Sequence, residues 1–163
     1  MFQRGEYVVL PREGLCKIEA IEEKSFFGQT KECYAVVPQK KSVATLFITK
    51  ETAEEKMRYP ISYDEASNLV SELDEIHALE IQNEKTREDE YKNALGRGNA
   101  KDCLALLKCL EQRKRERYAS NSLLTAVDDR YIRLVSTVIF SELSYVLGDT
   151  EIEKKVTERL ICV

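Results

Sequence analysis

The chain has 163 residues, of which 43% are apolar and 33% charged, and its net charge is −4. This length fits one large domain or two small ones with a hydrophobic core. A negative net charge argues against coating nucleic acid through bulk electrostatics, so any DNA contact has to be local. We see no apolar stretch of transmembrane length and no signal-peptide core, so we expect a cytoplasmic protein without a membrane partner.

The cysteines give no indication of a metal site. They are Cys16, Cys33, Cys103, Cys109 and Cys162. They form no CxxC pair and are accompanied by a single histidine, His77, so we expect no metal and no cofactor. We interpret them as reduced and mostly buried, although Cys16 and Cys33 could form a disulfide if their strands were neighbours. Because no serine or cysteine lies in a nucleophile motif, the sequence predicts no catalytic site.

The first sixty residues have the pattern of a small β domain. Apolar runs rich in β-branched and aromatic residues predict four or five strands, at 7–10, 16–21, 33–37 and 44–48. Proline, glycine and polar residues predict turns at 11–14, 27–29 and 39–42. This spacing is typical of a meander that closes into a small barrel-like sheet.

After Pro60 the apolar residues recur with a helical period. Four helix starts combine a capping side chain with an acid three positions later: Ser62 with Glu65, Asn99 with Asp102, Thr125 with Asp128, and Thr150 with Glu153. A further helix is expected from about 82 to 95, ended by the glycines around Arg97. We therefore predict an α+β protein, with a β domain at 1–58 and an all-α domain of about five helices at 62–163.

Several of these segments together resemble the CarD family of bacterial transcription regulators. The opening FQRGEYVVLPREG at 2–14 resembles the family's start, in which a glycine–acid pair precedes a Val-Val strand and a Pro-x-x-Gly turn. The similarity covers roughly residues 2 to 160, with a small insertion after Arg113. It continues through 18–22, Gly28, Tyr34, Arg58, LGRGN at 95–99, LTAVDDR at 124–130 and Glu142-Leu143.

The resemblance implies a Tudor-like N-terminal module that docks on the β subunit of bacterial RNA polymerase, like the matching module of transcription-repair coupling factors. The strand at 44–49 could offer its edge to a polymerase strand. By position, the expected polymerase contacts are Lys24, Thr45 and Phe47. Judged without the family, Phe47 could equally be a core aromatic and Lys24 a solvated charge.

The resemblance also implies that the helical domain reaches promoter DNA, where family members insert a tryptophan wedge into the minor groove beside basic residues. This chain has no tryptophan. The matching position falls at about Glu84, and Thr86 and Asp89 replace expected cations. The cations that remain as candidates for DNA contact are Lys85, Arg87, Lys92, Arg97, Lys101, Arg113, Lys114, Arg115 and Arg117. The run at 113–117 also suits a helix C-terminus, where the helix dipole favours positive charge.

Two functional hypotheses follow. In the first, the protein binds polymerase and also contacts promoter DNA weakly, without reading its sequence. In the second, it docks on polymerase or another protein and does not bind DNA. Glu84 and the acidic balance favour the second hypothesis, whereas the basic run at 113–117 favours the first, to which we give a narrow preference.

Overall fold

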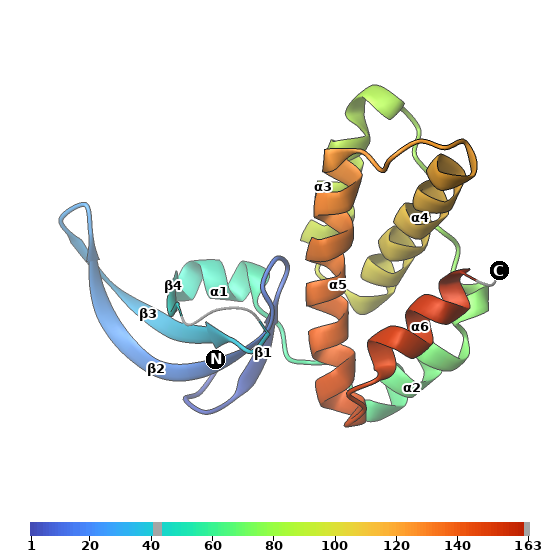
Figure 1. The fold of residues 1–163 in the computed structure, drawn as a ribbon. Coiled ribbons are helices and arrows are strands. Elements are labelled where there is room, and N and C mark those ends of the chain that lie inside the picture. Colours follow the sequence, from blue (N-terminus) through green and yellow to red (C-terminus); the bar gives the residue numbers. More distant parts are fainter. Residues whose placement is uncertain (41–43, 162–163) are drawn as a thin grey trace.

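The computed structural model describes residues 1–40 and 44–161, in which an antiparallel sheet lies beside a group of helices (Figure 1). The sheet has the order β1-β2-β3-β4. Its strands are β1 (Tyr7–Leu10), β2 (Gly14–Phe26), β3 (Gln29–Pro38) and β4 (Leu46–Thr49). Each strand pairs with the next along the chain, so the predicted meander is confirmed, although it remains an open sheet.

Two of the predicted turns join strands as expected. Residues 11–13 connect β1 to β2, and the two-residue turn Phe27-Gly28 connects β2 to β3. Both turn residues have positive φ, +48° and +81°, which suits the twist of a tight hairpin. The third predicted turn, 39–42, includes Lys41 and Ser42, which lie outside the described residues.

A short helix, α1 (Lys50–Lys56), directly follows β4 and was not predicted. Thr49 caps it, with its hydroxyl oxygen accepting the Thr52 amide at 3.3 Å. Ala53 and Met57 turn toward the sheet and are buried against strand residues such as Val36. Seven residues are too few to show a helical period, which explains why the sequence pattern did not reveal this helix.

Within the described residues, five α-helices follow the linker, in agreement with the prediction: α2 (Tyr63–Ser71), α3 (Arg87–Gly96), α4 (Ala100–Ala119), α5 (Ala126–Leu147) and α6 (Ile152–Ile161). Two 3₁₀ turns, η1 (Leu73–Glu75) and η2 (Glu84–Thr86), lie between α2 and α3. No helix in this part of the chain is long and apolar enough to cross a bilayer.

The predicted caps are correct at Ser62, Asn99 and Thr125, each of which accepts an amide at the third helical position. The prediction for Thr150 is wrong in detail, because Asp149 accepts the Glu151 amide at 2.9 Å. α3 also begins later than predicted. Asn83 caps η2 first, and the glycine with positive φ after α3 is Gly98.

Buried apolar residues form two clusters. The smaller lies between the sheet and α1. The larger fills the helical region and also takes in Val9 from β1 and Leu15 from β2. The helices therefore pack directly on the sheet, and the boundary between 1–58 and 62–163 remains a prediction.

The four described cysteines are free thiols. On the paired strands β2 and β3, Cys16 lies opposite Pro38 and Cys33 lies opposite Glu22, so the two cysteines are far apart along the sheet and the conceivable disulfide does not form. Burial raises the pKa of Cys16 to about 12, which keeps it protonated and unreactive. Cys162 lies outside the described residues.

The turn between β1 and β2 rests directly on α5. Gly14, where β2 begins, has φ +74°, and a methyl group there would lie 2.9 Å from the Thr137 carbonyl oxygen and would also overlap the Ser141 hydroxyl. The next amide, that of Leu15, donates to the Ser141 hydroxyl oxygen at 2.9 Å. Glycine is therefore required at this contact for both its backbone angle and its lack of a side chain.

Replacing Gly14 with alanine should lower the free energy of unfolding by about 3 kcal/mol, because strain and overpacking add at one position. Gly28→Ala is a matched control, since Gly28 also has positive φ but nothing lies near its Cβ position. We expect that control to cost about 1 kcal/mol. Urea unfolding measures both values, and equal losses would show that the close approach to α5 costs nothing.

Candidate functional site

The two edges of the sheet differ in what covers them. At the β1 edge, the Val9 amide donates to the Arg58 carbonyl at 2.8 Å, and the Arg58 amide donates back at 3.2 Å. At the other edge, β4 pairs with β3 alone among the described residues. Thr45 lies immediately before β4 and is exposed. The β4 edge is therefore the edge open to another strand.

Lys24 and Phe47 come together on one face of the sheet, opposite the face that α1 covers. The Lys24 ammonium lies 4.3 Å from the centre of the Phe47 ring, and also 3.3 Å from a Glu22 carboxylate oxygen. Phe47 is 40% exposed, whereas its neighbours Leu46 and Ile48 pack against the core. The interpretation of Phe47 as a core aromatic is thus wrong, and its ring is presented with a cation above it.

A groove of about 570 Å³ runs between β4 and the helices. One side is formed by residues 46–48 of β4 and by Thr52 and Lys56 of α1. The other side is formed by the turn after β1 and by residues of α3 and α5, among them Lys92 and Leu134. The open edge of the sheet therefore borders an open groove whose far wall is formed by helices.

One ion pair fixes the linker between the sheet and the helices. The Arg58 guanidinium donates to both carboxylate oxygens of Glu142, at 2.5 and 2.7 Å, and Glu142 is 1% exposed. Arg58 also donates to the Gly98 carbonyl, and the Ile61 amide donates to Glu142 at 2.9 Å. A bidentate pair of this kind sets both position and orientation.

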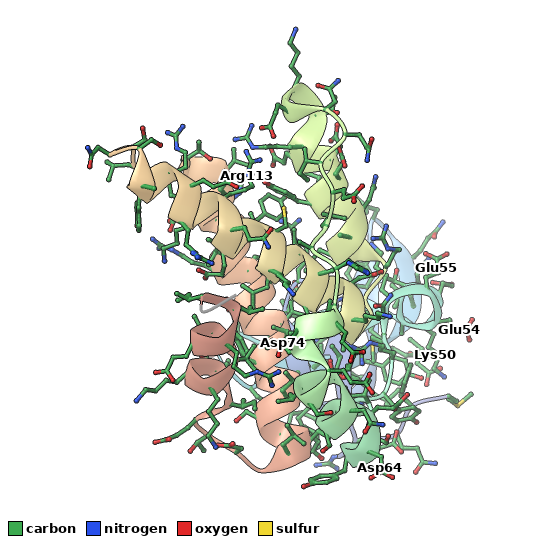
Figure 2. The ribbon with its side chains drawn as sticks, turned by 90° about the vertical axis from the view of Figure 1, so that its right-hand side faces the viewer. Lys50, Glu54, Glu55, Asp64, Asp74 and Arg113 are labelled. Carbon is green, nitrogen blue, oxygen red and sulfur yellow. The ribbon has the colours of Figure 1, made fainter. Side chains whose placement is uncertain are left out.

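Two of the cations expected to contact DNA are held inside the helical region by acids. Arg87 and Arg113 both contact the buried carboxylate of Asp128, at 3.2 and 3.4 Å. Arg113 also donates to both carboxylate oxygens of Glu84 at 2.8 and 2.9 Å; Figure 2 shows Arg113 on α4, beside the segment of η2 and α3. Glu84 is therefore a structural partner of Arg113, the first residue of the basic run.

Asp128 remains ionised although it is buried. Burial raises its pKa, but hydrogen bonds from Tyr91, Arg87 and Thr125, together with the attraction of Arg113, outweigh burial and hold the pKa below its usual range. The hydroxyl of Tyr91 donates to Asp128 at 2.9 Å. This cluster fastens α3, α4 and the start of α5 to one another.

The other predicted DNA contacts are spread over η2, α3, α4 and the segment between α3 and α4. Arg97 pairs with Asp102 at 2.5 Å, and Lys92 lies 3.8 Å from Glu88. Arg117 donates to the Leu123 carbonyl at 2.9 Å, and Lys114 lies over the Tyr118 ring. Lys85 and Arg115 are on η2 and α4. Among these cations, Lys92 lines the same groove as the polymerase candidate Phe47.

Residues 2–61 match the family model described as the CarD-like/TRCF RID domain, the last term denoting an RNA polymerase-interacting domain. This segment, which is less than half of the chain, is therefore similar to a family of protein-interaction domains. The matched segment ends within the linker that Arg58 fixes. No curated protein matches the chain.

Arg58→Met should lower the free energy of unfolding by about 3 kcal/mol, because it leaves the Glu142 carboxylate buried without its partner. Arg133→Met is the matched control, since Arg133 pairs with Asp129 at the surface and its loss should cost less than about 0.5 kcal/mol. Denaturant unfolding of both variants tests this. Similar small losses in the two variants would contradict a structural role for the linker pair.

Asp128→Asn should destabilise the protein in a pH-dependent way. The pKa of Asp128 is lower in the folded protein than in the unfolded chain, where it is about 4. The ionised carboxylate therefore stabilises the fold fully above about pH 4, and this stabilisation is lost as the pH falls through the folded-state pKa. The gap in unfolding free energy between wild type and variant should therefore be full at pH 7 and shrink in acid. Asp129→Asn, at the surface, is the control. A gap that is constant from pH 7 to pH 2 would contradict this assignment.

Proposed function

We propose that this protein docks on the β subunit of bacterial RNA polymerase by adding a polymerase strand to β4, and thereby modulates transcription initiation. One observation carries the proposal: the open edge of the sheet lies in the domain that matches the polymerase-interacting family. In strand addition, backbone hydrogen bonds supply affinity, and side chains beside the edge supply specificity.

Three side chains are suitably placed for that specificity. Phe47 offers an exposed ring, Lys24 offers a charge above it, and Thr45 extends the strand beyond its pairing with β3. Their closeness supports one contact surface built from β2 and β4. Aromatic side chains, Phe among them, are enriched in the buried centres of protein interfaces.

The role of the helical region in DNA contact is a second, weaker proposal. Arg87 and Arg113 are engaged with acids, so contact with phosphate would have to come mainly from cations that no acid holds in the described structure, such as Lys85, Lys114 and Arg117. The bidentate pair of Glu84 and Arg113 favours the alternative hypothesis, in which the protein docks on polymerase without binding DNA.

Thr45→Pro should abolish binding to purified RNA polymerase core while the protein stays folded. Leu46 is the first β4 residue in the register with β3, so a proline at position 45 spares that ladder and removes an amide only from the chain leading into the open edge. Thr45→Ala keeps the amide and should bind nearly as well as wild type. Unchanged binding of the proline variant would move the interface elsewhere.

Lys114→Ala with Arg117→Ala should reduce the promoter-dependent part of binding and flatten its salt dependence, if the helical region contacts phosphate. Arg113→Ala should instead mainly lower thermal stability, because Arg113 holds Glu84 and Asp128. Binding to polymerase with and without a promoter fragment, at two salt concentrations, separates these effects. An unchanged salt slope in the double variant would remove the DNA role of these two cations.

A further inference from the structure

We infer that the groove between β4 and the helices receives the docked polymerase segment, so that α3 and α5 form part of the docking site. The inference rests on the proposed function, because it requires a partner strand at the β4 edge. It enlarges the site beyond residues 2–61 to a helical wall that the matched domain does not include.

The backbone edge of β4 faces this groove. Side chains alternate between the two faces of a strand, yet the successive residues Leu46, Phe47 and Ile48 all line the groove. Three consecutive lining residues indicate that their shared edge, rather than one face, borders the space. A strand paired with that edge lies about 4.8 Å from it, which is inside the groove.

The far wall of the groove is largely apolar. Leu95 of α3 and Tyr131 and Leu134 of α5 line it, and Leu10 and Pro11 close one side. Leu95 and Tyr131 are almost fully buried and back the wall in fixed positions, and the half-buried Leu134 offers the apolar surface that a segment can reach. The inserted segment therefore meets a rigid apolar surface on the side away from β4.

The charges around the groove are mostly positive, in a chain whose net charge is −4. The cations are Arg12, Lys56 and Lys92, and the one lining acid is Glu13. Within the described chain neither Arg12 nor Lys56 forms an ion pair, and Lys92 has only a long contact with Glu88. Figure 2 shows Glu54 and Glu55 on the side of α1 turned away from the helices.

This lining determines the chemistry of the segment that fits. Apolar side chains would pack against the α3 and α5 wall, and carboxylates would meet Lys56 and Lys92 at the rims. Charge complementarity at an interface mainly supplies specificity and speeds association. The groove thus suits an extended polymerase segment that combines apolar and acidic side chains.

Charge substitutions at Lys92 of the full-length protein test the helical wall, with RNA polymerase core as the probe. Affinity should fall in the order wild type, Lys92→Gln and Lys92→Glu, with about a tenfold loss for the reversal, typical of one charge contact. Lys154→Glu on α6 is the matched control, because Lys154 is exposed and lies away from the groove, and it should bind as wild type does. Thermal unfolding verifies that each variant is folded.

If both Lys92 variants bind with wild-type affinity while Thr45→Pro loses binding, the helical wall takes no part in docking. The proposed docking on the β4 edge would then stand. Lys92 variants that weaken binding to duplex DNA alone, and not to core polymerase, would also overturn the helical wall, by assigning Lys92 to DNA. Unchanged binding in Thr45→Pro would instead remove the docking proposal, whatever the Lys92 variants do.

Discussion

The structure depends most on the contacts of Arg58. Its backbone pairs with Val9 and closes the β1 edge, while its guanidinium binds the buried Glu142 carboxylate on α5 and the carbonyl of Gly98 before α4. One residue therefore determines which sheet edge is blocked and how the sheet meets the helices. Because a buried carboxylate is costly without a partner, Glu142 holds the linker in one conformation. The contact of Gly14 with α5 fixes the same orientation from the other side of β1.

Because the sheet is held in one orientation against the helices, the open β4 edge lies opposite α3 and α5. The edge would be a simple exposed strand if the sheet stood alone, and such strands are prone to nonspecific pairing. Here α3 and α5 stand opposite it and restrict what can enter the groove. Farther along the helices, Glu84 and Asp128 hold Arg113, and Asp128 also holds Arg87, so these two arginines stabilise the bundle.

Local signals made much of the fold predictable. Apolar runs rich in β-branched and aromatic residues identified the strands, and capping residues such as Ser62 and Asn99 identified helix starts, because both signals lie within a few residues. The short helix α1 has too few residues to show a helical period, so the sequence did not predict it. The site was less predictable: the approach of Lys24 to Phe47 depends on strand register, including the bulge between Ile18 and Ala20. The ion pairs of Asp128 and the groove join distant segments, which no local pattern reveals.

Hydrogen exchange of the protein bound to RNA polymerase core tests the central claim most directly, because an edge strand that gains a partner also gains protection of its outward amides. Docking through the open edge predicts slowed exchange at 45–48, with little change at the β1 edge, which Arg58 already closes. Protection confined to the helical region, with β4 exchanging as in the free protein, would contradict docking through the open edge.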